Sequence, residues 1–153
     1  MNNPVIPLPR LSEANGTHFR IPAELRIAYV DSQLEPVAQY LKAELAEKSS
    51  ATLNFASTPA AAEIVLEIVT GDPALSALPE PQGVAPVSSS RAGERYGLEV
   101  NERGLRVWAF TKEGAFRGAT TAAQLLTLAT DGKVAGTRIL DSAQYEWRGL
   151  SVD

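Results

Sequence analysis

The stretch that decides the fold of this 153-residue chain lies at residues 96–110 and reads YGLEVNERGLRVWAF. The runs Tyr96–Val100 and Leu105–Phe110 flank the four residues Asn101–Gly104. Two strand-like runs joined by a short segment that contains glycine are typical of a β-hairpin, in which Gly104 can supply a positive φ. We therefore expect an antiparallel pair of strands in the middle of the chain.

A helix is predicted directly after the hairpin, over residues 113–129. Thr111 can cap its N-terminus, and Asp131-Gly132 ends it. The small residues Gly114 and Gly118 would let the helix lie close against a sheet. Its apolar stripe has helical spacing and consists of Phe116, Ala119, Ala123 and Leu126, widened by Leu125 and Leu128.

A second helix is predicted upstream of the hairpin, over residues 33–48. Asp31-Ser32 offers an N-cap, Ser32 and Glu35 have the spacing of a capping box, and Pro36 falls in the first turn, where its missing N–H costs least. The apolar residues recur at helical spacing: Leu34, Val37, Ala38, Leu41 and Leu45.

The remaining strand-like runs set the fold class. Further strands are predicted at 16–21, 25–30, 53–55, 62–70 and 134–140. A doubly wound parallel sheet needs a helix after nearly every strand, and only two helices are predicted. The pattern favours an α+β fold, with a mixed or antiparallel sheet and both helices packed on one face.

Three segments differ in composition from this domain, which we place at residues 16–143. Residues 1–15 begin with three closely spaced prolines and are expected to form an extended arm. Residues 71–93 are rich in glycine, proline and serine and are expected to form a mobile loop. Residues 144–153 form a tail with two aromatic residues and an Arg-Gly pair.

Charge and composition exclude several function classes. The net charge is −4 and no run of Lys or Arg forms a patch, so we expect no nucleic-acid partner. No apolar stretch approaches the length of a membrane span. The chain has no cysteine, and its one histidine, His18, lacks partners at ligand spacing, so no metal site is expected. The spacing of its glycines matches neither a dinucleotide-binding motif nor a P-loop, so no cofactor is expected.

Two groups of side chains are candidate sites for sugar chemistry. Glu63 and Glu67 would lie roughly 13 Å apart on one strand face, too far for a retaining glycosidase pair, and we interpret them as part of a solvated face. Arg106, Trp108 and Phe110 project from one face of the hairpin strand and could stack on a sugar, but packing in a core or interface is the more common role of such aromatics.

The tail resembles the first barrel strand of the family 20 glycoside hydrolases, the β-N-acetylhexosaminidases. In that family an aromatic-Arg-Gly run that ends in Asp leads into the catalytic (β/α)₈ barrel, and here the run is Trp147–Asp153. The segments before it are also similar to the family: Tyr96–Val100, the Gly104 turn, Leu105–Val107, Glu113–Gly118, Gln124–Leu126 and Ile139–Asp141.

The resemblance implies that residues 16–143 are a non-catalytic N-terminal domain and that residues 144–153 begin a barrel absent from this chain. That barrel would be the partner of the domain. It would remove terminal N-acetylhexosamine residues from chitin, peptidoglycan or glycan fragments, with the acetamido oxygen of the substrate as nucleophile. Arg148 matches the family arginine that grips hydroxyls of the non-reducing sugar. No catalytic residue falls within the chain.

The sequence leaves open alternatives for the role of Arg148 and for the family of the domain. Arg148 could instead form a structural ion pair with a carboxylate such as Asp153. Similar two-helix domains precede barrels in α-glucuronidases and in some O-linked N-acetylglucosamine hydrolases, and a free-standing carbohydrate-binding module is a third reading. The start of the chain has no basic or apolar leader segment. For the parent enzyme, the resemblance implies a periplasmic or secreted location.

Overall fold

The computed structural model describes residues 11–70, 95–129 and 131–141. Its strands are β1 (Leu11–Arg20), β2 (Glu24–Tyr29), β3 (Thr52–Phe55), β4 (Ile64–Ile68), β5 (Tyr96–Asn101), β6 (Gly104–Ala109) and β7 (Lys133–Asp141). Its helices are α1 (Glu35–Lys48) and α4 (Lys112–Thr127), with two short 3-10 turns, η1 (Ser32–Leu34) and η2 (Pro59–Ala61).

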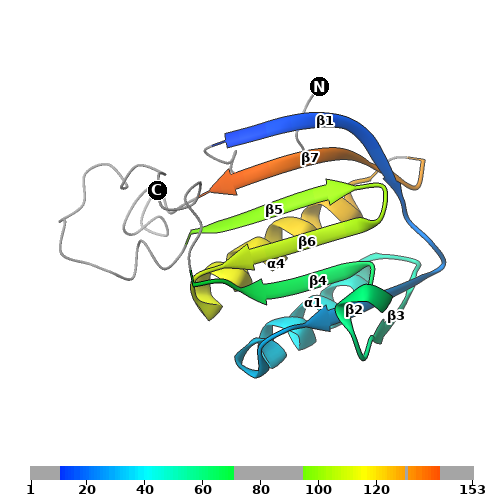
Figure 1. The fold of residues 1–153 in the computed structure, drawn as a ribbon. Coiled ribbons are helices and arrows are strands. Elements are labelled where there is room, and N and C mark those ends of the chain that lie inside the picture. The colour runs from blue at the N-terminus through cyan, green and yellow to red at the C-terminus, as the bar shows by residue number, and fades with distance from the viewer. Residues whose placement is uncertain (1–10, 71–94, 130, 142–153) are drawn as a thin grey trace, which may run out of the picture.

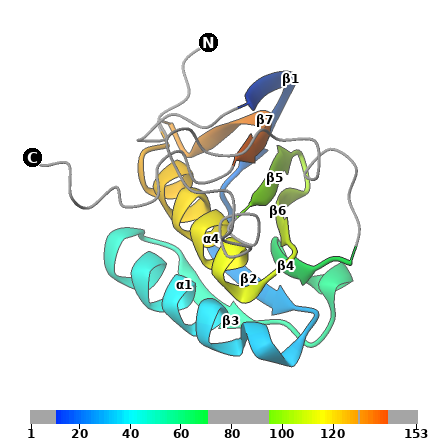
Figure 2. The ribbon, with the colours of Figure 1, turned by 90° about the vertical axis from the view of Figure 1, so that its left-hand side faces the viewer.

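The strands form one mixed sheet of seven strands in the order β1-β7-β5-β6-β4-β2-β3 (Figure 1). The half from β3 to β6 is parallel, and the half from β6 to β1 is antiparallel. Both helices lie on the same face of this sheet (Figure 2). The predicted α+β class, with a mixed sheet and two helices on one face, is confirmed.

The hairpin at the centre of the sheet is formed as predicted. β5 and β6 pair antiparallel from Tyr96↔Ala109 to Asn101↔Gly104. Gly104 has a φ of +145°, and a Cβ there would lie 2.0 Å from the carbonyl oxygen of Glu63. The next amide, that of Leu105, donates to this oxygen at 2.8 Å. Glycine is therefore required both by the turn and by the close approach of β4.

The helix caps are partly as predicted. Thr111 caps α4, because its hydroxyl accepts a hydrogen bond from the amide of Gly114 at 3.1 Å. The expected capping box of Ser32 and Glu35 is wrong: Ser32 lies inside η1, and Asp31 accepts from the amide of Gln33 instead. The chain enters α1 through this 3-10 turn, so the first turn of the helix needs no side-chain cap.

The main core fills the space between the helices and the sheet. Its largest fully buried side chains are Tyr96, Leu25, Ile27, Leu34, Leu41, Leu45, Ile64, Leu66, Leu98, Leu105 and Ile139. The predicted close approach of helix to sheet is confirmed at Gly118, where a Cβ would lie 2.5 Å from a methyl group of Val107 and 3.0 Å from the ring of Tyr96.

The predicted apolar stripe of α4 is correct in its middle and wrong at its ends. Ala119, Ala123, Leu125 and Leu126 are buried, but Phe116 is 44% exposed and Leu128 is 53% exposed. In the first turns of α4 the residues that face the sheet are Gly114, Ala115 and Gly118, all of which are buried. The Phe116 ring points instead to the ring of Tyr40 on α1, with centroids 4.7 Å apart.

Some predicted boundaries shift, and others lie outside the described residues. β1 begins at Leu11, so the boundary expected at residue 15 falls inside a strand that pairs with β7. β4 is shorter than the predicted strand over 62–70 because η2 precedes it. The loop expected over 71–93 and the barrel strand expected after residue 143 lie outside the residues that the structure describes.

Candidate functional site

The sheet face opposite the helices carries ion pairs, as the solvated-face interpretation of Glu63 and Glu67 anticipates. Arg26 donates to Glu63 from its guanidinium at 3.0 Å and from its backbone amide at 2.7 Å. Arg106 donates to Glu67 through Nε at 3.1 Å. Each of the two glutamates therefore faces its own arginine, and the two carboxylates do not act as a pair.

The pKa of Glu63 reflects two opposing effects. Partial burial of its side chain raises the pKa, but hydrogen bonds from Arg26 and the charge of that guanidinium outweigh the burial, so that the pKa lies below its ordinary value. The carboxylate is held ionised as a partner for Arg26. A general acid needs the opposite shift, which makes Glu63 unsuited to that role.

Glu63→Gln should destabilise the fold at neutral pH but not in acid. A carboxyl whose pKa is lower in the folded state contributes stability above its unfolded pKa, and this contribution is lost as the pH falls through the folded pKa. Urea midpoints should therefore differ at neutral pH and converge well below about pH 4.3. Glu13→Gln, an exposed position on β1, is the matched control for loss of one charge. A constant difference across the range would contradict this assignment.

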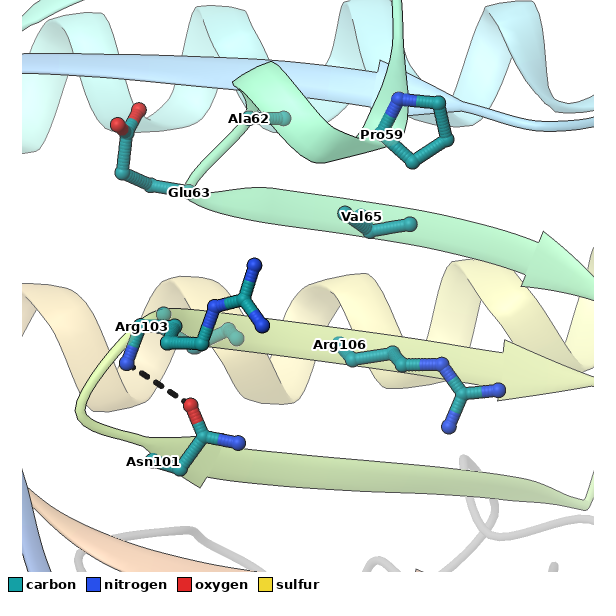
Figure 3. A pocket seen from close by; sticks show the side chains of 9 residues that line it. Pro59, Ala62, Glu63, Val65, Asn101, Arg103 and Arg106 are labelled. Atoms are coloured by element: carbon teal, nitrogen blue, oxygen red, sulfur yellow. Dashed lines mark hydrogen bonds between the residues drawn. The ribbon is translucent and has the colours of Figure 1, made fainter.

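A shallow hollow of about 180 Å³ opens on the same face, between η2, the start of β4 and the β5–β6 turn. Asn101 accepts from the amide of Arg103 at 2.9 Å, and Figure 3 shows Arg106 extending along β6 away from Arg103 and Glu63 turned toward β2. Because Glu63 and Arg106 are held in the ion pairs described above, the hollow presents the exposed Arg103 and no acid–base pair. We assign it no chemistry.

The aromatic side chains of β6 do not form a sugar-stacking surface. Trp108 is only 4% exposed and packs with Leu140, Val69 and Phe110. Gly97 makes this possible, because a Cβ there would lie 2.3 Å from the indole ring. The guanidinium of Arg106 covers the ring at 4.7 Å from its centroid. The packing interpretation of this stripe is therefore the correct one.

A buried polar group that the sequence did not predict lies where β7 ends. We call it the Asp141 cluster: Tyr96, Arg117, Thr121 and Asp141. Asp141 has a side chain 7% exposed and pairs with Arg117 at 3.5 Å. The hydroxyl of Tyr96 lies 2.6 Å from that of Thr121 and donates to Asp141 at 3.4 Å. Burial and the nearby charge of Asp141 raise the pKa of Tyr96 far above its usual range, so its hydroxyl remains a donor.

The alternation of side chains along β7 explains this cluster. Asp141 pairs with Tyr96 across the strands and lies on the same face as Ile139, the face covered by α4. A carboxylate on that face must find its partners in the helix layer. One signal for this cluster was available in the sequence: Arg117, a charged residue, stands among the small residues of the buried face of α4.

The other candidates from the sequence lie as follows in the structure. Arg148 lies outside the described residues. His18 is exposed on β1. Within residues 11–70, 95–129 and 131–141, no group of three or more His, Cys, Asp or Glu side chains could hold a metal ion. None of the helices described is long and apolar enough to cross a membrane.

Comparison with known proteins places this fold. The family model described as glycosyl hydrolase family 20, domain 2, matches residues 2–142. A search of curated proteins finds no match. Among solved structures, the chain is similar to the family 20 β-N-acetylhexosaminidase of Streptomyces coelicolor A3(2), with 26% identity and a TM-score of 0.69 over 95% of this chain and 28% of that one.

Two more distant structures show the same fold. The family 20 exo-β-N-acetylglucosaminidase of Vibrio harveyi, solved with N-acetylglucosamine, gives a TM-score of 0.71 at 19% identity, over 95% of this chain and 20% of that one. The β-N-acetylhexosaminidase of Bacteroides fragilis gives a TM-score of 0.63 at 15% identity, over 92% of this chain and 25% of that one. This chain thus spans between a fifth and about a quarter of these proteins. By its family model and its fold, the chain belongs to the glycosyl hydrolase family 20 domain 2 family.

Proposed function

We propose that this chain is the non-catalytic supporting domain of a β-N-acetylhexosaminidase, docked on the catalytic barrel of the same enzyme. The parent would remove terminal N-acetylhexosamine residues by substrate-assisted retaining hydrolysis. Membership of the family and the similarity to hexosaminidases support this, as does the small share of those proteins that the chain spans. The acids that perform the reaction would lie in the remaining part of the enzyme.

The observation that carries the docking proposal is the aromatic pair on the helix layer. Phe116 is 44% exposed and contacts Tyr40 across the two helices. The next residue, Arg117, is bonded to Asp141 at the end of β7. β7 therefore ends at the turn of α4 that carries Phe116, and we propose the domain that follows in sequence as the partner that covers the exposed ring.

Phe116→Gln should separate stability from docking. In the 153-residue chain the exposed ring contributes little, so the change in the free energy of unfolding should stay within about 1 kcal/mol. In the intact enzyme it should lower the melting temperature clearly, because an interface side chain is lost. Leu128→Gln, at the other end of α4 and 53% exposed, is the matched control and should have little effect in either protein. Equal behaviour of the two variants in the intact enzyme would contradict docking at Phe116.

Arg148 is the substrate-binding residue that we propose for the parent enzyme, on the strength of the resemblance of residues 147–153. A guanidinium can donate to two neighbouring hydroxyls at once, which an ammonium cannot. Arg148→Lys in the intact enzyme should lower kcat/KM by about tenfold or more at an unchanged melting temperature. Normal kinetics with a lowered melting temperature would show a structural ion pair instead. The 153-residue chain alone serves as the blank, because we expect it to give no turnover of a chromogenic N-acetylglucosaminide.

A further inference from the structure

The edge strand β1 is interrupted by a bulge over Asn15, Gly16 and Thr17. Its pairing with β7 changes register at this point, and Gly16 has a φ of +82°. The bulge folds over β7 at Gly136, where a Cβ would lie 2.1 Å from the side-chain oxygen of Asn15 and 2.2 Å from the hydroxyl oxygen of Thr17. The missing side chain of Gly136 therefore leaves room for the bulge to reach across β7.

The side-chain amide of Asn15 links β1 to β5 across the intervening strand. Its nitrogen donates to the backbone carbonyl of Val100 at 2.9 Å. Its oxygen accepts from the amide of Thr17 at 3.0 Å and from the hydroxyl of Thr17 at 2.6 Å. A carboxylate at this position could accept both bonds from Thr17 but could not donate to Val100. The link to β5 therefore requires the amide.

The residue that follows Asn15 leaves this amide open to attack by the backbone. Gly16 has no side chain to hinder an approach of its nitrogen to the side-chain carbonyl carbon of Asn15, and a Cβ built at Gly16 would meet nothing within 4 Å. The other asparagines of the described residues, Asn54 and Asn101, are followed by phenylalanine and glutamate, whose side chains crowd the corresponding nitrogen. Asn15 is thus the asparagine with the least hindered neighbour.

We propose that Asn15 is a site of spontaneous deamidation and that the opening of β1 sets its rate in the folded chain. The nitrogen of Gly16 bonds to the side-chain carbonyl carbon of Asn15, and the bond from that carbon to the amide nitrogen breaks. Ammonia leaves with the proton that the Gly16 nitrogen loses. Water then opens the resulting cyclic imide at one of its two carbonyls, which gives aspartate or isoaspartate at this position.

The hydrogen bonds of Asn15 make the reaction depend on local opening. While the amide is bonded to Val100 and Thr17, the side chain cannot rotate freely into the position for attack. β1 lies at the edge of the sheet and pairs on one side only, with β7 (Figure 1). A strand of this kind opens more readily than the centre of a sheet. Deamidation in turn removes the donor to Val100, so the product should hold β1 more weakly.

The test is incubation of the 153-residue chain in mildly alkaline buffer, folded and in urea, with peptide mass mapping of the conversion of amide to carboxyl. Asn15 should convert at least about tenfold more slowly in the folded chain than in urea, where β1 is open throughout. Thr17→Val removes one bond to the amide and should speed conversion about fivefold in the folded chain and not in urea. Thr17→Ser keeps the hydroxyl and is the matched control.

Two outcomes would overturn the proposal. Equal rates in the folded chain and in urea would show that opening of β1 does not set the rate. An unchanged amide in both the folded chain and folded Thr17→Val, after complete conversion in urea, would show that Asn15 is no site in the native protein. Gly16→Ala in urea checks the route, because a side chain there should slow conversion by about tenfold or more. An undiminished rate in that variant would exclude attack by the Gly16 nitrogen.

The expected weakening of β1 has a test of its own in amide hydrogen exchange. Asn15→Asp, which mimics the direct product, should speed exchange in β1 because the donor to Val100 is lost. Asn101→Asp is the matched control: Asn101 accepts from the amide of Arg103, and a carboxylate can accept in its place. Unchanged exchange in β1 of Asn15→Asp would show that the link to Val100 does not hold the strand, and would overturn the proposed dependence on its opening.

Discussion

Gly104→Ala should lower the free energy of unfolding of the domain by about 3–5 kcal/mol. The residue has a φ of +145°, and a side chain held in such a region costs on the order of 1–3 kcal/mol. The new Cβ would also lie 2.0 Å from the carbonyl oxygen of Glu63. Relief of that overlap must push β6 away from β4 and weaken the bond from Leu105 to the same oxygen.

The contribution of the overlap can be separated from that of the backbone conformation. Gly16 and Gly132 also have positive φ values, +82° and +68°, but a Cβ at either position would meet nothing within 4 Å. Alanine at those positions should cost only about 1–2 kcal/mol each. Urea denaturation of the three variants measures the difference. Equal losses in all three would show that the approach of Glu63 to Gly104 does not matter.

The hairpin could be predicted because its information is local. The turn segment and its glycine stand within one short stretch, and helix caps such as Thr111 are local in the same way. The order of the strands could not be predicted. β3 and β4 follow each other in sequence but lie on either side of β2, to which both are parallel. A placement of that kind depends on how the whole sheet covers α1.

Side-chain spacing along α4 predicted an apolar face but not its limits. Phe116 and Leu128 fit the stripe by position, yet both are exposed, while Gly114 and Ala115 before Phe116 are buried. Spacing shows which residues share a face of a helix, and the partner element decides how much of that face is covered. Phe116 was therefore misplaced in the core, and its exposure is the observation from which docking is proposed.

The pairing of Arg117 with Asp141 was beyond the reach of the sequence for a different reason. The two residues are 24 positions apart and belong to a helix and a strand, so no periodicity connects them. Their proximity follows from two facts that only the structure supplies: β7 lies beside β5, and α4 packs against β5 and β6.

Asp141→Ala should lower the free energy of unfolding by about 3–5 kcal/mol, since the partly buried guanidinium of Arg117 loses the carboxylate that pairs with it and the hydroxyl of Tyr96 loses an acceptor. Asp141 has a side chain 7% exposed and Arg117 one 23% exposed, so water can only partly replace the lost carboxylate. Glu67→Ala is the control, because its partner Arg106 has a side chain 47% exposed, and exposed pairs contribute about 0–1 kcal/mol. Urea midpoints of the two variants should differ accordingly, and similar losses would contradict the buried character of the Asp141 pair.

Removal of both charges distinguishes the cost of breaking the pair from what the pair itself contributes to stability. Asp141→Leu combined with Arg117→Met removes both charges of the pair, and replacements of this kind are often neutral or stabilising by about 1–4 kcal/mol. The double variant of the 153-residue chain should therefore recover most of the stability that Asp141→Ala loses. A loss of stability that persists in the double variant would show that apolar side chains cannot replace the pair at this place.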